Sequence, residues 1–86
     1  MGYRPEITVE LYGTLAALAG GQKRVTVEAG DLRDLYKALK TAYPAMAEHL
    51  ESNVSVSIDG RVYTEALFEK IGPENEVVLL PRISGG

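Results

Sequence analysis

The stretch Glu76-Val77-Val78-Leu79-Leu80 decides the expected fold, because it is a nearly continuous apolar run close to the C-terminal end of the chain. Such a run is typical of a strand that lies in the middle of its sheet. Pro81 comes next and ends the strand, since a proline has no backbone N–H to donate to a neighbour. We therefore expect a central strand over residues 76–80.

Two segments near the N-terminus show the two-residue alternation of half-buried strands. Residues 7–12 place Ile, Val and Leu at alternate positions, and residues 22–28 do the same with two valines. Between them, residues 13–20 hold Leu15 and Leu18 among glycines, which suits a single helical turn. The length of this connection predicts a wide hairpin rather than a tight one.

The segment from Asp31 to Tyr43 predicts one main helix. Its leucines and tyrosines recur at spacings of three and four, which is the stripe of a helix that buries one side. Asp31 can cap the first turn by accepting a hydrogen bond from the backbone N–H three residues on. Pro44 ends the helix because it disfavours helical geometry at Tyr43. A short second turn is expected over residues 45–50.

A tight hairpin is expected in the second half of the chain. Residues 53–58 alternate between apolar and polar, and Asp59-Gly60 is the strongest two-residue hairpin signal available. Residues 61–63 then form the returning strand. Thr64 can cap the turn that follows, and residues 72–75 form the loop before the last strand.

The expected order of elements is therefore strand, strand, helix, strand, strand, strand. This is an α+β arrangement with one main helix and a mixed sheet, in which the last strand lies beside the first. It resembles the ubiquitin-like β-grasp, and the expected strand order rests on that resemblance. We expect one β-grasp domain over residues 1–81, followed by a flexible C-terminal tail over residues 82–86 that ends in Gly-Gly.

Composition and charge exclude several classes of function. The chain has 86 residues, with 9 basic against 12 acidic side chains and no cysteine. A net charge of −3 argues against nucleic-acid binding, which needs a basic face to neutralise phosphates. The lack of cysteine excludes a disulfide framework, a thiolate metal site and a thiol nucleophile.

No segment of the sequence suits a membrane. No apolar run approaches the roughly 18 residues of a membrane span. The first residues also lack the apolar core of a signal peptide. We expect a cytoplasmic protein that makes no membrane contact.

The side chains offer little catalytic chemistry. His49 is the only imidazole and lies between Glu48 and Glu51, but no nucleophile or orienting partner is suitably spaced from it. We expect His49 to be a solvated residue at a helix end. The carboxylates are dispersed along the chain, so neither a metal site nor a bound cofactor is expected. The chain has no catalytic side chains of its own.

The C-terminal tail Arg82-Ile83-Ser84-Gly85-Gly86 stands apart from the rest of the chain. Nothing remains for it to fold against, so it should project into solvent. One interpretation is a frayed end made of small residues. The other is functional: an end without side chains can lie extended in a narrow channel of a partner enzyme and present only the α-carboxylate of Gly86.

Four segments of the sequence together carry a family resemblance. They are the opening VELYGTLAALAG (residues 9–20), the helix end AYP (residues 42–44), the hairpin VSIDG (residues 56–60) and the ending NEVVLLPRISGG (residues 75–86). In this order they resemble the MoaD/ThiS family of sulfur carriers. Within that family the resemblance is closest to MoaD-type chains, the small subunits of molybdopterin synthase.

The resemblance implies a specific chemistry for Gly86. An E1-like adenylating enzyme would use ATP to adenylate its carboxylate, and a sulfurtransferase would supply the sulfur that converts it to a thiocarboxylate. The tail would then enter a large molybdopterin synthase subunit of the MoaE type and donate sulfur to a pterin precursor. Because the chain has no cysteine, any sulfur it carries must sit on the terminus.

The resemblance also implies a partner interface around the start of the tail. The expected contact residues are Tyr12, which lies where the family has an aromatic residue, Leu80 and Pro81. Leu80 and Ile83 flank the emerging tail. Apolar anchors of this kind dominate many interfaces, although Leu80 could also be plain core. The family often has two prolines after the last strand, whereas here Pro81 is followed by Arg82. Arg82 could pair with acidic residues of a partner or mark a relative from another pathway.

Three other functions stay open. The carrier could serve another product, such as thiamine, a sulfur amino acid or a tungsten cofactor. It could be a ubiquitin-like modifier in which Gly86 forms an isopeptide bond with a substrate lysine. It could also be a β-grasp binding module whose terminal glycines are incidental.

Overall fold

The computed structural model describes residues 4–52, 54–63 and 67–81. Its elements follow the predicted order, with short helices at the two predicted turns. They are β1 (Glu6–Leu11), α1 (Thr14–Leu18), β2 (Arg24–Glu28), α2 (Leu32–Ala42), the 3-10 helix η1 (Pro44–Met46), α3 (Ala47–Ser52), β3 (Val54–Ile58), β4 (Arg61–Tyr63) and β5 (Val77–Pro81). The predicted tail over residues 82–86 and the predicted cap Thr64 lie outside the described residues.

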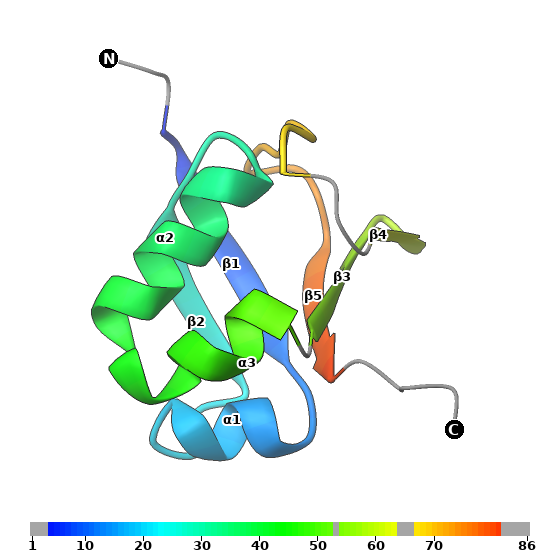
Figure 1. Ribbon diagram of the computed structural model, residues 1–86. Coiled ribbons are helices and arrows are strands. Elements are labelled where there is room, and N and C mark those ends of the chain that lie inside the picture. Colours follow the sequence, from blue (N-terminus) through cyan, green and yellow to red (C-terminus); the bar gives the residue numbers. More distant parts are fainter. Residues whose placement is uncertain (1–3, 53, 64–66, 82–86) are drawn as a thin grey trace.

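The five strands form one mixed sheet in the order β2-β1-β5-β3-β4 (Figure 1). β5 lies in the middle, parallel to β1 and antiparallel to β3. The pairs β1–β2 and β3–β4 are both antiparallel hairpins. The predicted α+β arrangement and the predicted central position of the last strand are therefore confirmed.

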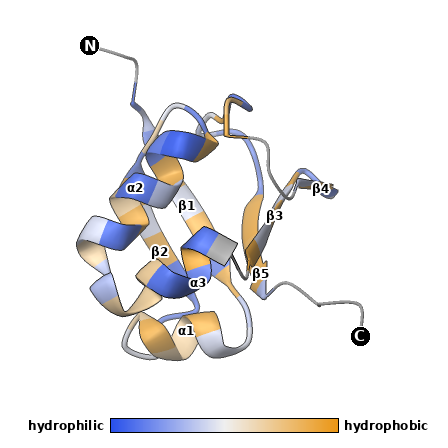
Figure 2. Ribbon diagram, in the orientation of Figure 1, coloured by the Kyte–Doolittle hydropathy of each residue, from blue (hydrophilic) through white to orange (hydrophobic). Residues whose placement is uncertain are grey.

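The apolar run of β5 is buried on one side only. Val77 and Leu79 are buried, whereas Val78 and Leu80 alternate with them and are half-buried. Figure 2 shows the nearly continuous hydrophobic colour of this strand beside helices that cover a single face of the sheet. Because no second layer of helices covers the other face in the described chain, the run does not behave as a strand buried on both sides.

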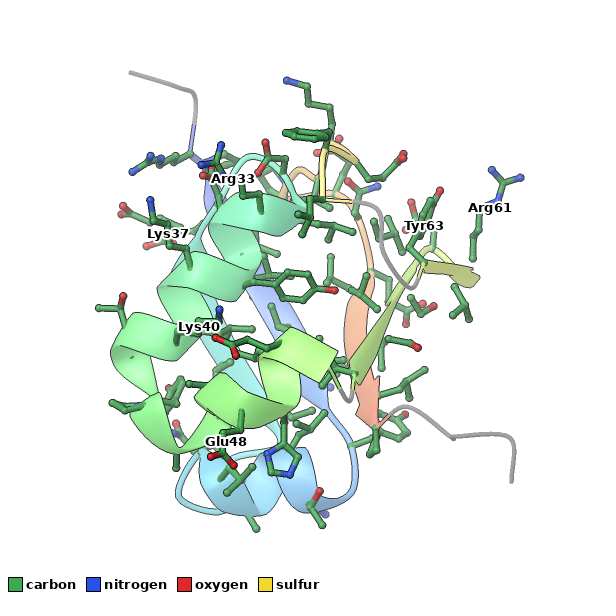
Figure 3. All side chains as sticks on the ribbon, viewed as in Figure 1. Arg33, Lys37, Lys40, Glu48, Arg61 and Tyr63 are labelled. Carbon is green, nitrogen blue, oxygen red and sulfur yellow. The ribbon has the colours of Figure 1, made fainter. Side chains whose placement is uncertain are left out.

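Helix α2 packs through the stripe that its spacing predicts. Leu32, Leu35 and Leu39 are fully buried, while basic residues such as Lys37 lie on the outward side (Figure 3). Asp31 caps the helix as expected, its Oδ1 accepting from the Asp34 N–H at 2.8 Å. No membrane-crossing helix is found in the part of the chain that the structure describes.

The β3–β4 hairpin is tied to the start of β5 through Asp59. Asp59 and Gly60 have φ values of 52° and 87°, the left-handed pair that a two-residue turn requires. The Asp59 carboxylate accepts from the Glu76 backbone N–H at 2.8 Å and from the Asn75 side chain at 2.6 Å. These two hydrogen bonds lower the pKa of Asp59. They also set where β5 enters the sheet.

Candidate partner-docking site

The C-terminal ends of β1 and β5 lie side by side, and the tail begins at this point. The last register pair is Leu11 with Leu79, and the Tyr12 N–H donates to the Leu79 carbonyl at 3.2 Å. One residue further, Gly13 lies against the Pro81 ring, where an added Cβ would come 3.1 Å from Pro81 Cγ. Tyr12 and Gly13 therefore flank the last two residues before the tail.

Gly13 is required by this geometry. Its φ of +62° lies in the left-handed region, which residues with a Cβ adopt at a cost. It is also the N-cap residue of α1. The chain thus passes from β1 to α1 through two residues, Tyr12 and Gly13, and the second of them packs against the Pro81 ring.

The structure brings together three of the predicted interface residues. Tyr12 is 52% exposed, Pro81 is exposed, and Leu80 is half-buried. Leu80 follows Leu79, which is fully buried, so its side chain points to the opposite face of the sheet. The helices do not cover that face, so the Leu80 side chain lies outside the hydrophobic core and is only half-buried. Ile83 and Arg82 lie outside the described residues.

Two further apolar residues, which were not predicted from the sequence, extend this surface. Val62 is 58% exposed and lies opposite Ser57, which in turn lies opposite Val78. Cross-strand partners share a face, so Val62 and Val78 lie on the same open face as Leu80 and, from its place after β1, Tyr12. The apolar face, as we call it, consists of Tyr12, Val62, Val78 and Leu80.

A sequence signal for Val62 was available. A two-residue turn fixes the register of a hairpin, so the Asp59-Gly60 turn places Val62 opposite Ser57. The alternation of residues 53–58 places Ser57 on the solvent-facing side of its strand, so Val62 is expected on that side as well. No such signal exists for Val78, because a continuous apolar run does not reveal which of its residues face outward.

A shallow depression of about 830 Å³ adjoins the apolar face at Tyr12 and Gly13. Lys23 and Arg24 line its other side, and Arg24 lies 3.7 Å from the Glu10 carboxylate. The surface beside Pro81 therefore combines an aromatic side chain with two cations, one of which is paired with the Glu10 carboxylate that also lines the depression. This combination suits a protein partner with apolar and acidic groups.

The prediction that His49 is solvated is wrong. His49 lies in α3 and is half-buried, and its Nδ1 is buried with no hydrogen-bond partner in the described structure. The reason is that the chain turns at Pro44, so that α3 packs back against α2 and β3. Among residues 4–52, 54–63 and 67–81 no polar side chain is fully buried, and no His, Asp and Glu cluster could hold a metal.

The mixed five-stranded sheet crossed by one main helix defines the class of protein, a β-grasp domain of the ubiquitin-like kind. The chain belongs to the ThiS family, because the sequence model of that family matches residues 9–86. The match includes Tyr12 and the whole predicted tail. The predicted family resemblance is thereby confirmed.

Three solved structures illustrate the likeness. Small archaeal modifier protein 1 from Haloferax volcanii is 27% identical, with a TM-score of 0.75 over 94% of this chain and 99% of that one. CysO from Mycobacterium tuberculosis is 22% identical, with a TM-score of 0.76 over 90% and 99%. A chain in the complex of subunits 1 and 2 of the molybdopterin-converting factor from Helicobacter pylori is 18% identical, with a TM-score of 0.65 over 94% and 99%. No curated protein sequence matches this chain.

Proposed function

We propose that this protein is a cytoplasmic sulfur carrier that bears sulfur on the carboxylate of Gly86 and delivers it to a molybdopterin precursor. The observation that supports this most is the position of the apolar face. Tyr12 and Leu80 lie where β1 and β5 end, directly beside the start of the tail. A partner that docks on this face receives the terminus at the same time.

The chemistry at Gly86 runs in two steps. The carboxylate oxygen attacks the α-phosphate of ATP on an E1-like enzyme, which forms an acyl-adenylate and releases pyrophosphate. Hydrosulfide (HS⁻), supplied by a sulfurtransferase, then attacks the acyl carbon, AMP leaves with the electron pair of the broken C–O bond, and the S–H proton is lost to solvent. The resulting thiocarboxylate is a better nucleophile than the carboxylate, because sulfur is softer and more polarisable than oxygen.

The same face is proposed to serve successive partners. The adenylating enzyme and a large synthase subunit of the MoaE type both need the tail in their active sites, so they bind one after the other. The ThiS-family fold recurs in the H. pylori complex of subunits 1 and 2, which supports a second subunit as the partner here. No side chain of this protein takes part in the bond-breaking steps.

Intact mass spectrometry tests the proposal. The protein is incubated with a cognate E1-like enzyme, ATP and a sulfur source, and the oxygen-to-sulfur exchange should raise its mass by about 16 Da. A variant that lacks Gly85 and Gly86 serves as the control and should show no change. If the full-length protein also keeps its mass while the enzyme consumes ATP, the terminus is not thiocarboxylated.

A second candidate is a ubiquitin-like modifier, which the 27% identity to small archaeal modifier protein 1 favours. In that case the adenylated Gly86 is attacked by a substrate lysine, and an isopeptide bond forms. A ladder of larger conjugates on a blot, lost on deletion of Gly85 and Gly86, supports this function. Reconstitution with large subunits from molybdopterin, thiamine or sulfur amino acid pathways separates the possible carrier pathways.

A further inference from the structure

The outer edge of β2 is a free strand edge. Among residues 4–52, 54–63 and 67–81, β2 is a terminal strand of the sheet and pairs only with β1. The Leu11 N–H donates to the Lys23 carbonyl at 2.9 Å, and the Ala29 N–H donates to the Pro5 carbonyl at 3.0 Å. Odd-numbered residues of this segment therefore bond inward to β1. By alternation, the backbone N–H and C=O groups of Arg24, Thr26 and Glu28 point outward.

The outward edge of β2 carries opposite charges at its two ends. β2 reads Arg24-Val25-Thr26-Val27-Glu28, with a cation at one end, an acid at the other and Thr26 in the centre. All three residues with free backbone groups are exposed on the open face of the sheet. An edge with charges of one sign would repel a second copy of itself. The charges of this edge are instead complementary to those of a second copy of β2 that runs antiparallel to it.

We propose that two copies of this protein associate through their β2 edges, antiparallel and with the two-fold axis at Thr26. Thr26 then lies opposite the partner subunit's Thr26 and exchanges both backbone hydrogen bonds with it. Arg24 lies opposite the partner subunit's Glu28, and Glu28 lies opposite the partner subunit's Arg24. The two sheets become one continuous sheet, and every outward backbone group of β2 gains a partner.

The charges favour this register over the other antiparallel registers of two β2 strands. A shift that puts the axis at Arg24 or at Glu28 places two like charges directly opposite each other, which is destabilising. The axis at Thr26 places opposite charges at both ends of the interface. Glu28 lies opposite Glu6 in the β1–β2 ladder, and neither carboxylate has an ion-pair partner in the described chain. The partner subunit's Arg24 would offset the repulsion between these two carboxylates.

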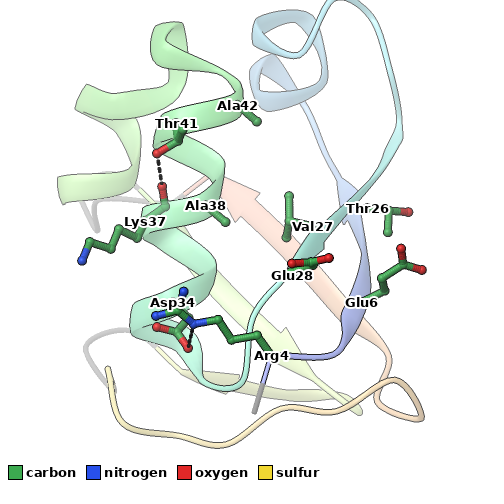
Figure 4. Close-up of a pocket in the computed structure, with 10 residues that line it drawn as sticks. All are labelled: Arg4, Glu6, Thr26, Val27, Glu28, Asp34, Lys37, Ala38, Thr41 and Ala42. Atoms are coloured by element: carbon green, nitrogen blue, oxygen red, sulfur yellow. Dashed lines mark hydrogen bonds and ion pairs between the residues drawn. The ribbon is translucent and has the colours of Figure 1, made fainter. Parts of the chain in front are cut away.

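Space for the second strand is present beside α2. A groove of about 600 Å³ separates β2 from α2 (Figure 4). The α2 wall of the groove carries the small side chains of Ala38, Thr41 and Ala42, and Val27 lines the β2 side. On this side of the sheet the partner subunit's Val25 comes opposite Val27, which extends the apolar contact across the interface.

The association leaves the apolar face beside the start of the tail accessible, although it shares Arg24 with the depression next to that face. β5 is separated from the β2 edge by β1, so the start of the tail does not lie at the interface. The other edge of the sheet is β4, which has only three residues and offers a much shorter ladder. A carrier of this kind would present two termini, one from each copy.

A charge-exchange experiment tests the interface. Sedimentation equilibrium of the full-length protein should show a reversible dimer of about twice 9.3 kDa, with a dissociation constant below about 1 mM. Arg24→Glu and Glu28→Arg should each weaken self-association about tenfold, because like charges then face each other at both ends. An equal mixture of the two variants should restore the dimer as a heterodimer, since every facing pair is again of opposite sign. Thermal unfolding of each variant confirms that it is folded.

A crosslinking experiment tests the register directly. The chain has no cysteine, so Thr26→Cys introduces a single thiol on the proposed axis. Directly opposed, hydrogen-bonded residues have Cα atoms about 5.5 Å apart, which is within disulfide range. Oxidation should therefore give a covalent dimer. Thr8→Cys is the matched control, because Thr8 is the exposed neighbour of Thr26 one strand inward and should crosslink far more slowly.

Four results would overturn the proposal. One is a protein that stays monomeric up to about 1 mM. Another is a dimer whose affinity is unchanged in the Arg24→Glu and Glu28→Arg variants, which would place the interface elsewhere. The third is equal crosslinking rates for Thr26→Cys and Thr8→Cys. Capture of an added extended peptide at this edge in place of a second copy would likewise contradict self-association.

Discussion

Gly13 lies against the ring of Pro81, so closely that a Cβ on Gly13 would come 3.1 Å from Pro81 Cγ. This contact joins the end of β1 to the residue from which the tail departs. It depends on a φ of +62° at Gly13, and it places Tyr12 beside Leu80. The position of Pro81 relative to the apolar face therefore depends on a glycine almost 70 positions away in the sequence.

Replacing this glycine should disturb the start of the tail. Gly13→Ala combines an unfavourable positive φ, which costs about 1–2 kcal/mol, with a contact that Pro81 must move to relieve. Gly20→Ala is the matched control, because Gly20 has a φ of +72° and nothing within 4 Å of the added Cβ. Urea unfolding should show a larger loss of stability for Gly13→Ala. Equal losses would mean that the contact with Pro81 carries no energy.

The apolar face should contribute to partner binding without contributing to folding. Val62 is 58% exposed, so Val62→Ala should leave the free energy of unfolding nearly unchanged while weakening the complex with the adenylating enzyme about tenfold. Phe68→Ala is the control, since Phe68 is 75% exposed but lies in the turn that contacts the start of α2 through Leu67. Calorimetric titration with the adenylating enzyme measures the binding of both variants. Similar losses for the two variants would show that exposed apolar area alone governs binding.

The terminal glycine should matter for chemistry but not for stability. Gly86→Ala should keep the melting temperature within about 1–2 °C, because the last residue of a chain usually contributes little packing. The added methyl group should obstruct a narrow channel and reduce thiocarboxylation more than tenfold. The rate of mass increase with the adenylating enzyme measures this effect. Unchanged thiocarboxylation would contradict the narrow-channel argument.

Acid should weaken the fold in part through Asp59. The backbone N–H of Glu76, followed by the side chain of Asn75, lowers the pKa of this carboxyl in the folded state. Its contribution is therefore fully present above the unfolded pKa of about 3.9 and is lost as the pH falls through the lower folded value. Asp59→Asn should flatten the pH dependence of unfolding between about pH 2 and pH 5. Asparagine tolerates the left-handed φ of 52° at this position.

A control separates this effect from a general loss of acidic charge. Glu69→Gln removes an exposed carboxylate that makes no hydrogen bond in the described structure, and it should leave the pH dependence close to that of the original protein. Unfolding followed by circular dichroism across the same pH range compares the two variants. Parallel changes in both would attribute the acid sensitivity to net charge.

Local sequence signals were sufficient for the order and type of the elements. The alternation in β1, the cap at Asp31 and the Asp59-Gly60 turn each act over a few residues, so their outcome does not depend on the rest of the chain. The environment of His49 shows where such signals fail. Its burial depends on how α3 packs after the turn at Pro44, which is a contact between elements and leaves no periodic trace in six residues.

The sequence by itself was enough for the family, through the resemblance of four segments, and for the central position of the last strand, which its continuous apolar run indicates. Only the tertiary structure decided which side of β5 is open, that Val62 and Val78 join Tyr12 and Leu80, and that the β2 edge faces outward. The physical reason is that exposure of a strand depends on what covers it. In this chain the helices cover one face of the sheet, and the strand order leaves β2 as an edge strand.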